Sequence, residues 1–485
     1  MCIKTALLRQ RRAVYIIYKR TNKRKKQMKL VKEKSFYFNI LAITVPLALH
    51  NLINFSTNMF DTIMLGRADD TGVLLSAASL AGQPFFLLLI FIFGISGAGG
   101  VLSAQYWGKK NIEAIKIVFA TVIRIAFFST VVFTAVILLF PENVMGILTN
   151  RPEVIKPGSE YLKIIAWAYP LFAISSSFVC SLRSVEIVRV FAIFSIFTLF
   201  ISVGLNYVLI FGNLGFPALG IRGAAIATLT ARIFEFIFVM SYVFLIDKRL
   251  KFRPKNFLLK NKQLLCDLLR HGSPVVGAEL AWALGMVVQA AIFGHITYSH
   301  GDPVAANSIT GVVQHFSSVF MFGIANAAAV LIGKAVGEGN TDDVKAKSDT
   351  FKVIALIAGL TASAMILLVR NPVVSFYNLD EATARLARDM LIVSAVCVNF
   401  ISFAATYIVG ILRGAGDTAF CLKVEIAALW LFSLPIAAFL AFILQLPVPF
   451  VLLGMRSDEA VKTIVCTIRT RGKKWIKLVA RDELE

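Results

Sequence analysis

The chain has 485 residues, of which 58% are hydrophobic and only 16% are charged, and its mean hydropathy is +0.76. A soluble domain is about 45–50% apolar and about 25% charged. Because so few charges cannot cover a water-exposed surface, the composition excludes a soluble globular protein and predicts that apolar side chains face lipid. The formal net charge of +22 would suit a nucleic-acid-binding protein, but the positions of the charges argue against that class.

The basic residues gather in three segments. Residues 1–36 hold thirteen Lys and Arg, residues 247–271 hold eight and residues 466–485 hold six, whereas the connections at 298–303 and 446–449 have none. This alternation is the positive-inside pattern of membrane proteins. It predicts a multi-pass protein of the cell membrane with both termini and the 247–271 loop in the cytoplasm, where the basic loops contact anionic lipid.

Apolar runs of about 20 residues, long enough to span a bilayer, recur along the chain. In chain order we predict twelve spans, near 38–64, 73–104, 112–140, 160–181, 190–211, 223–246, 272–297, 304–333, 351–369, 389–411, 422–445 and 447–466. The last includes Arg456 and Asp458 and gives the weakest pattern. The predicted fold is an all-α polytopic membrane protein of about 12 transmembrane helices.

The sequence also repeats internally. When the chain is shifted by 228 to 230 residues, an ordered series of glycines, prolines and short blocks coincides. The matched positions are Pro46 with Pro274, Gly66 with Gly294, Gly82 with Gly311, Phe93-Gly94-Ile95 with Phe322-Gly323-Ile324, Gly108 with Gly337, Asn111 with Asn340, and Leu182-Arg183 with Leu412-Arg413. The repeat contains six spans, an even number, so both halves have one orientation and are related by an axis along the membrane normal.

This repeat predicts the domain organisation. The predicted segments are a basic cytoplasmic segment (1–36), an N-terminal six-helix lobe (37–246), a cytoplasmic linker (247–270), a C-terminal six-helix lobe (271–468) and a cytoplasmic tail (469–485). Met28 opens a more ordinary amino terminus than Met1, so residues 1–27 are either a start-site artefact or a genuine basic tail. Two lobes around a central cleft are typical of a transporter that rocks between two states.

One face of the first span is polar. Asn51, Asn54, Asn58 and Asp61 are three or four residues apart, which places them within one arc of a helix. Lipid penalises such side chains, so this face is expected to look into the bundle or a wet cleft. A buried carboxylate must be protonated or paired, so we interpret Asp61 as an ion-coupling residue for Na+ or a proton. The asparagines either line a substrate cavity or only hydrogen-bond neighbouring helices.

The repeat places a second set of side chains on the corresponding face of the seventh span. An offset of 228 residues leads to Glu279, Trp282, Met286 and Gln289. We interpret Glu279 as a second ion-coupling carboxylate and the other three as cavity-lining side chains.

Four further residues complete the candidate site. Asn206 on the fifth span is expected to face the first-half cavity and contribute to ion coupling. Glu235 is another ion-coupling candidate, although Arg232 three residues earlier allows simple neutralisation on one helix face. His315 is a candidate proton carrier, a role that competes with ordinary hydrogen bonding. Tyr407 is expected to line the cleft, where aromatic rings hold flat apolar cations by π contacts.

Enzyme motifs are absent from the sequence. We find no HExxH, Walker A, GxSxG or strand-linked GxGxxG pattern, and the six cysteines show no metal-ligand spacing. No catalytic, metal or cofactor site is therefore expected. Without an ATP motif, uphill transport would need an ion gradient.

The sequence resembles the multidrug and toxic compound extrusion (MATE) family, within the multidrug/oligosaccharidyl-lipid/polysaccharide flippase superfamily. The stretches that carry the resemblance are NMFDTIMLG (58–66), AQYWGKKN (104–111), LNYVLIFGNLGFPALGIRGAAIAT (205–228), LIGKAVGEGN (331–340) and LRGAGDT (412–418). The likeness covers nearly all of residues 36–478. It implies two six-helix lobes in a V shape, antiport of Na+ or H+, and export of varied, often cationic, organic compounds.

The resemblance also bears on the candidate residues. Asp61 stands where the family has an aspartate in span 1. One branch has an aspartate in span 5 where this chain has Asn206, and another branch has one in span 10 where this chain has Ser402. Glu279 resembles the span 7 glutamate of that second branch but sits about one turn nearer the proline. The coupling ion therefore stays open between Na+ and H+.

We accordingly predict a monomeric, cation-coupled antiporter that exports drugs or other small organic compounds by rocker-switch alternating access, with no cofactor besides the transported ion. The alternative is a lipid-linked saccharide flippase of the same superfamily. A flippase would present several cationic residues to its cavity, and intramembrane Arg and Lys are few in this chain. A membrane-embedded enzyme is disfavoured because the five histidines show no metal spacing.

Overall fold

A computed structural model describes residues 30–68, 73–297, 301–377 and 379–482, apart from the side chain of Asn58. Helices make up 85% of the structure, and the described ranges contain no strand. The predicted all-α polytopic fold is confirmed. The helices fall into two groups that follow the two halves of the sequence.

In its described part, the first half contributes eight α-helices, joined by short connections. They are α2 (Lys34–Ala68), α3 (Val73–Gly108), α4 (Ile112–Leu139), α5 (Pro141–Leu148), α6 (Pro152–Ile165), α7 (Ala168–Arg183), α8 (Arg189–Phe211) and α9 (Gly220–Ser241), which η1 (Tyr242–Ile246) extends.

The second half begins after the short η2 (Pro254–Leu258) and ends at Arg471. Its elements are α10 (Lys262–Gly294), α11 (Pro303–Gly337), α12 (Thr341–Phe376), α13 (Glu381–Ala405), η3 (Thr406–Leu412), α14 (Thr418–Ile426), η4 (Ala427–Ser433), α15 (Leu434–Ala438), η5 (Phe439–Ile443), α16 (Val448–Met455) and α17 (Ser457–Arg471). Helix α10 starts at Lys262, inside the stretch 247–270 predicted as the linker, so the non-helical connection between the halves ends nine residues earlier than predicted.

Ten of the described helical segments are long and apolar enough to cross a membrane, or eleven if α6 and α7, bent by 53°, form one span. These eleven coincide with the first eleven predicted spans. The twelfth differs, because the helix breaks between α16 and α17 at Arg456, whose guanidinium lies 3.4 Å from the Gln314 amide oxygen. The charged side chains of Asp458, Glu459 and Lys462 make α17 less apolar than the other spans.

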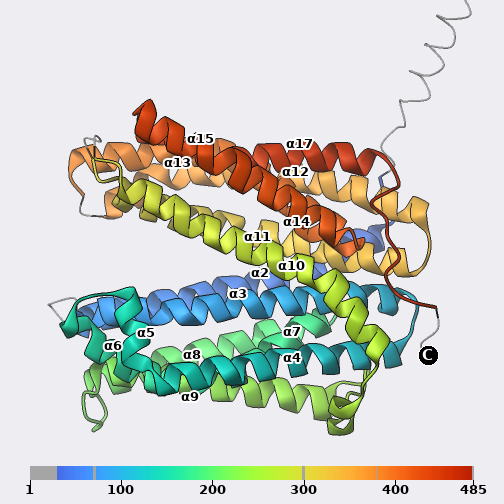
Figure 1. The fold of residues 1–485 in the computed structure, drawn as a ribbon, viewed down its shortest axis with the longest axis horizontal. Coiled ribbons are helices and arrows are strands. Elements are labelled where there is room, and N and C mark those ends of the chain that lie inside the picture. Colours follow the sequence, from blue (N-terminus) through green and yellow to red (C-terminus); the bar gives the residue numbers. More distant parts are fainter. Residues whose placement is uncertain (1–29, 69–72, 298–300, 378, 483–485) are drawn as a thin grey trace, which may run out of the picture.

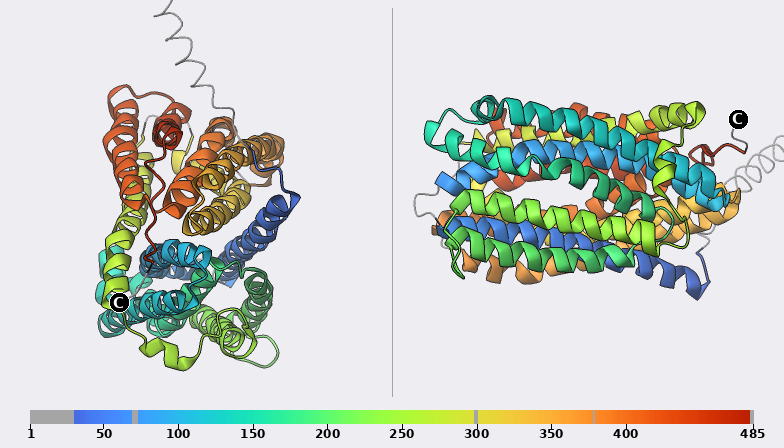
Figure 2. Two further views of the ribbon diagram at one scale, coloured as in Figure 1. Left: turned by 90° about the vertical axis from the view of Figure 1, so that its right-hand side faces the viewer. Right: turned by 90° about the horizontal axis from the view of Figure 1, so that it is seen from below.

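The helices form two side-by-side lobes. In Figure 1, α3 to α9 lie in the lower half of the molecule and α11 to α17 in the upper half, with α10 crossing between them. The end-on view on the left of Figure 2 separates the same two groups. Most of the contact between the helices of the two lobes is made by α2 and α3 on one side and α10 and α11 on the other.

Small residues let the backbones of the two lobes approach closely. A Cβ placed on Gly94 of α3 would lie 2.9 Å from the Val276 Cα of α10, and one placed on Gly272 would lie 2.8 Å from the Ala98 Cβ. These residues lie in the C-terminal half of α3 and the N-terminal half of α10, and the two helices diverge toward the left in Figure 1. Lobe contact is therefore tightest toward the end that carries the linker.

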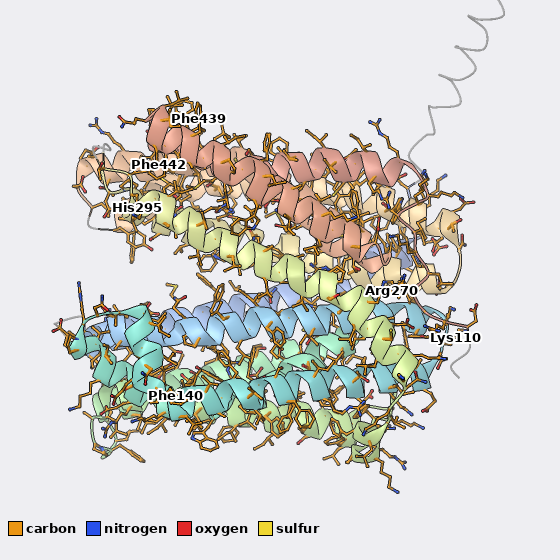
Figure 3. The ribbon with its side chains drawn as sticks, viewed as in Figure 1. Lys110, Phe140, Arg270, His295, Phe439 and Phe442 are labelled. Carbon is orange, nitrogen blue, oxygen red and sulfur yellow. The ribbon has the colours of Figure 1, made fainter. Side chains whose placement is uncertain are left out.

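That end is also the basic one. Lys110 and Arg270 lie at the right-hand end of Figure 3, whereas the exposed Phe140, Phe439 and Phe442 lie toward the left. The repeat is visible in local detail at the same end. Asn111 and Asn340, which the internal repeat aligned, both cap the helix that follows, their side chains accepting from backbone N–H groups three residues on, at 3.0 and 3.1 Å.

Each lobe has its own packed interior, and α2 belongs to both. The first half of α2 places Phe36, Ile40 and Leu47 in a buried cluster with residues of α11, α12 and η3. The second half of α2 lies against α8. One helix thus links the C-terminal lobe to the polar centre of the N-terminal lobe.

Candidate functional site

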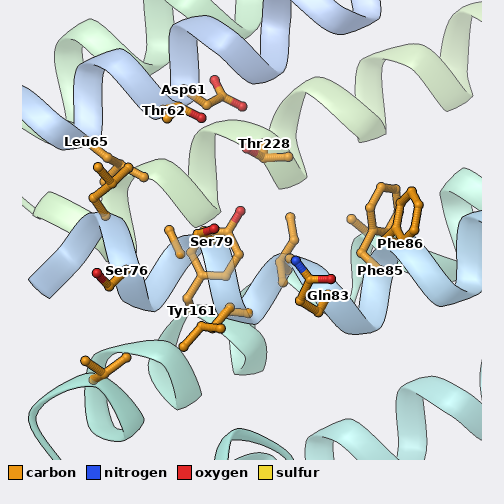
Figure 4. Close-up of a pocket in the computed structure, with 18 of the residues that line it drawn as sticks. Asp61, Thr62, Leu65, Ser76, Ser79, Gln83, Phe85, Phe86, Tyr161 and Thr228 are labelled. Atoms are coloured by element: carbon orange, nitrogen blue, oxygen red, sulfur yellow. The ribbon is translucent and has the colours of Figure 1, made fainter. Parts of the chain in front are cut away.

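A cavity of about 1020 Å³ opens inside the N-terminal lobe, between α2, α3, α6, α7 and α9. It lies near the beginning of α3 and the end of α2, remote from the linker. Figure 4 shows Asp61 and Thr62 of α2 and Thr228 of α9 on one side, and Ser76, Ser79 and Gln83 of α3 together with Tyr161 of α6 on the other. Aromatic rings from α3 and α7 close one wall, so the cavity has a polar side and an apolar side. The aromatic residues of this wall are Phe85, Phe86 and Tyr169.

Asp61 provides the cavity with a carboxylate that has only a neutral partner. The Asn206 side-chain amide of α8 donates to the Asp61 carboxylate, and Asp61 makes no salt bridge among the described residues. Asn206 is fully buried, and its own amide oxygen has no hydrogen-bond donor. The two candidates that the sequence placed on separate spans are thus brought together. Their oxygens are of the kind that bind Na+, and the carboxylate can equally accept a proton.

The cation nearest to Asp61 on the cavity wall is already neutralised. Arg232 lines the cavity, and its guanidinium donates to Glu235 at 2.6 Å. The same guanidinium lies 5.1 Å from the centre of the Phe172 ring. Glu235 is therefore held by its neighbour on α9, as the three-residue spacing suggested. The hydroxyl of Tyr161 shares a hydrogen bond with Thr228 and completes the polar wall.

The three asparagines of the α2 stripe divide into different environments. Asn54 lies 3.1 Å from His50, whose other ring nitrogen lies 2.5 Å from the Ser195 hydroxyl of α8. This chain ties α2 to α8 and matches the helix-bonding interpretation. Asn51 is exposed and does not line the cavity. The side chain of Asn58 lies outside the described residues.

In the C-terminal lobe, the candidate carboxylate has a cationic partner. Glu279 of α10 accepts from the Arg413 guanidinium, which follows η3, at 2.9 Å. Arg413 is only 8% exposed and its Nε has no acceptor. A Cβ on Gly97 of α3 would lie 3.7 Å from the same guanidinium, so the pair stands at the boundary between the lobes.

The remaining candidates of the second half do not form a single cavity wall. Trp282 is partly exposed on α10, at 37%, and Met286 is half-buried. Gln289 is buried and donates to the Met455 carbonyl at 3.4 Å, which ties α10 to α16. His315 of α11 is exposed and stacks on Phe55 of α2, with ring centroids 5.7 Å apart.

Tyr407 differs most from its predicted place. It is 3% exposed and belongs to the buried cluster of the C-terminal lobe. Its hydroxyl accepts from Thr467 at 3.0 Å. The π-helical turn η3 directs this ring into the lobe rather than toward a cleft.

The sequence reasoning missed two charged partners. Arg413 was noticed only as a repeat marker, although it binds Glu279. Lys462 of α17 is 2% exposed and contacts Glu425 at 2.7 Å and Asp458 at 2.8 Å, with Glu459 at 3.5 Å. The run of charges in the twelfth span was the available signal, because a buried lysine requires such partners. No group of three His, Cys, Asp or Glu in the described ranges is arranged to hold a metal ion.

A polytopic helical protein with two repeated lobes and a polar cavity inside one of them is a membrane transporter by its architecture. The comparisons with known proteins agree with this class. A sequence model of the MatE family matches residues 46–208 and 274–439, so the chain belongs to that family. The two matches begin at Pro46 and Pro274, the prolines that the internal repeat aligned.

Curated relatives match this chain in sequence over most of its length, and solved structures share its fold. The chain is 25% identical to the "Probable multidrug resistance protein NorM" of Thermotoga maritima, covering 90% of this chain and 93% of that protein. It is 24% identical to the "Probable multidrug resistance protein YoeA" of Bacillus subtilis, covering 87% and 90%. The eukaryotic MATE transporter AtDTX14 superposes with a TM-score of 0.80 at 17% identity, covering 92% and 97%. A transporter of the MOP superfamily from Pyrococcus furiosus superposes with a TM-score of 0.80 at 18% identity, covering 89% and 94%.

Proposed function

We propose that this protein is a monomeric antiporter that couples entry of Na+ or H+ to export of drugs or other small organic, often cationic, compounds. The observation that carries the proposal is Asp61, a carboxylate on the wall of a cavity of about 1020 Å³ whose only described partner is the neutral amide of Asn206. Such a carboxylate is free to exchange a proton, a metal cation or a cationic substrate. The names of the NorM and YoeA relatives, multidrug resistance proteins, support this substrate class.

Coupling follows if ion and substrate compete for the same lobe. A cation that enters from the outside neutralises Asp61 and removes the charge that attracts a cationic substrate into the cavity. Release of the cation on the opposite side restores that charge. In this structure the Arg413 guanidinium already occupies the position beside Glu279 that a transported cation would take. Glu279 would therefore act as a second coupling carboxylate only in a state in which Arg413 has moved away.

Alternating access would arise by rocking of the lobes. The lobes contact each other closely near the basic end, at Gly94 and Gly272, and α3 and α10 diverge toward the other end. The positive-inside pattern assigns the basic end to the cytoplasm. We therefore assign the structure to a state that faces outward, in a cell membrane with both termini cytoplasmic.

The test is efflux of a fluorescent lipophilic cation from proteoliposomes, with Na+ and H+ gradients imposed separately. We expect a response to one gradient that Asp61→Asn reduces to the level of protein-free liposomes. Thr62→Ser, on the same wall of the cavity, is the matched control and is expected to retain efflux. Full gradient-driven efflux by Asp61→Asn would remove this residue from the mechanism.

A protein that responds to neither gradient would contradict antiport. The same vesicles would then be assayed for translocation of a lipid-linked saccharide, the activity of the alternative flippase. Two arginines, Arg151 and Arg232, line the cavity. Arg232 is neutralised by Glu235, and an anionic headgroup beside Arg151 would also meet Asp61, so the wall gives such a headgroup little net attraction.

A further inference from the structure

After α17, the chain crosses from one lobe to the other as an extended segment, Gly472–Asp482, which we name the C-terminal strap. The left view of Figure 2 shows it running from the upper group of helices across to the lower group, and in Figure 1 it follows the right-hand end of the molecule. This is the end where the lobes contact each other. The strap therefore contacts residues of both lobes.

The beginning of the strap is anchored in the C-terminal lobe. Trp475 is fully buried in the cluster formed with α11, α12 and η3. The Lys477 backbone N–H donates to the Ala415 carbonyl at 2.9 Å, and its ammonium lies 2.6 Å from the Asp417 carboxylate. These contacts would move with the C-terminal lobe.

The next residues of the strap bind the end of α3 in the N-terminal lobe. Gln105 is fully buried, accepts from the Val479 and Ala480 backbone N–H groups at 2.7 and 3.2 Å, and donates to the Lys477 carbonyl at 3.1 Å. Lys109 donates to the Ala480 carbonyl at 2.8 Å. Val479 and Ala480 are buried in the apolar cluster of the N-terminal lobe, so the attachment is both polar and apolar.

An ion pair closes the strap. The Arg481 guanidinium contacts both oxygens of Asp267 at 2.6 and 2.9 Å, and its backbone N–H donates to the Tyr106 hydroxyl at 3.2 Å. Asp267 stands in the first turns of α10, where Leu264 and Leu268 pack in the N-terminal cluster. A two-pronged guanidinium–carboxylate contact has the most demanding geometry of the common ion pairs, so a small displacement would break it.

We propose that the C-terminal strap is a latch that holds the two lobes together at the linker end, and that opening of the transporter toward that side requires residues 479–482 to leave α3 and α10. The proposal rests on the lobe movement proposed above. Because Trp475 stays with one lobe and Gln105 with the other, separation of the lobes must stretch the strap or detach it. The strength of these contacts would then set the fraction of molecules that open at this end.

The experiment measures this fraction directly. Spin labels on Glu113→Cys in the N-terminal lobe and Glu338→Cys in the C-terminal lobe, both exposed at the linker end, would report the distance between the lobes in proteoliposomes, with Cys2 and Cys266 replaced by serine. No substrate or ion gradient is applied. A failure of the latch is therefore distinguishable from a failure of antiport.

Arg481→Glu is the principal variant, and we expect it to raise the fraction with separated labels about five- to tenfold, as loss of an ion pair plus added repulsion predicts. The swap of Arg481→Glu with Asp267→Arg is expected to restore the original distribution. Lys474→Glu makes the same charge change at an exposed strap position and is expected to leave the distances unaltered. Gln105→Leu, which removes the side-chain hydrogen bonds to the strap, is expected to act in the same direction as Arg481→Glu.

Two results would overturn the proposal. In the first, neither Arg481→Glu nor Gln105→Leu changes the distance distribution. In the second, both variants lower the temperature of unfolding while the lobes keep their spacing, which would make the strap a static anchor of the folded state.

Discussion

Asp61 and Glu279 stand on the first helices of two repeated units, yet their surroundings are opposite. Asp61 faces a cavity, and its one partner among the described residues is the neutral amide of Asn206. Glu279 faces the lobe boundary and is bound by the buried Arg413 guanidinium. The C-terminal lobe holds Glu425 in the same manner, through Lys462. The N-terminal lobe therefore leaves the Asp61 carboxylate without a cationic partner among the described residues, whereas the C-terminal lobe pairs Glu279 and Glu425 with buried cations.

This contrast has a thermodynamic consequence. Removing one member of a buried ion pair leaves its partner charged without compensation in a medium of low dielectric constant. Removing the charge of a carboxylate that is bound only by an amide leaves no uncompensated charge behind. Substitutions should thus cost stability in the C-terminal lobe and activity in the N-terminal lobe.

Lys462→Met is expected to have the largest effect on stability. Lys462 is 2% exposed and contacts three carboxylates, so its loss should lower the free energy of unfolding by about 3–5 kcal/mol. A denaturant titration of the purified protein in detergent measures this. Lys473→Met removes an exposed ion pair with Asp342 and should change little. Equal stability of Lys462→Met and the parent protein would refute the contrast between the lobes.

Glu279→Gln is expected to have a smaller effect, because the Glu279 side chain is 26% exposed. Its loss should cost about 1–2 kcal/mol, since Arg413 keeps a neutral acceptor. A double-mutant cycle with Arg413→Gln measures the coupling energy of the pair. Additive effects in that cycle would mean that the ion pair contributes nothing of its own.

Asn54→Ala tests the part of the α2 stripe that bonds helices. It removes the amide at the start of the Asn54–His50–Ser195 chain, at a cost of about 0.5–1.5 kcal/mol in unfolding free energy. Asn51→Ala, at an exposed position three residues earlier, is the matched control and should lie within about 0.5 kcal/mol of the parent. If both variants lost the same stability, the hydrogen-bond chain would not be the cause.

Asp61→Asn should have the smallest effect on stability, within about 0.5 kcal/mol, because an amide can still bond with Asn206. The same variant is expected to lose gradient-driven efflux, so stability and transport separate at this position. Measuring the free energy of unfolding and the rate of efflux of the same variant tests this separation. A loss of more than about 2 kcal/mol would assign Asp61 a structural role of the kind that Lys462 has.

Much of the fold could be predicted from the sequence because hydropathy and repeat spacing are both local signals. Eleven predicted spans coincide with helices or with the bent pair α6 and α7. The break at Arg456 was harder to see, since one arginine in an apolar run is compatible with an unbroken helix. At the break, Arg456 contacts Gln314, more than a hundred residues away, and spacing within one span does not reveal such a tertiary contact.

The site could be predicted only in part, for the same reason. Helical spacing brought out Asp61, and its position as a polar residue in the apolar fifth span brought out Asn206, but nothing in the sequence predicted a hydrogen bond between the two. The partners of Glu279 and Glu425 lie on other helices and were not identifiable from spacing on one helix. No sequence pattern predicts the cavity-lining role of Gln83, Tyr161 and Thr228. A single polar residue in an apolar helix can be assigned to a site only when the structure shows a cavity beside it.

The close approach of Gly108 to Gly337 has a consequence for how such a protein can change. These two residues are repeat mates, and a Cβ on Gly108 would lie 3.0 Å from the Gly337 Cα. Ala104 and Gly333, one turn earlier, are in the same relation. A residue at the pseudo-twofold axis thus packs against its own repeat mate, as a residue does at the self-complementary interface of a homodimer. After a gene duplication, the two copies at the axis limit each other's size, as the small pair Ala104 and Gly333 illustrates, whereas copies far from it, such as Asp61 and Gln289, are free to acquire separate tasks.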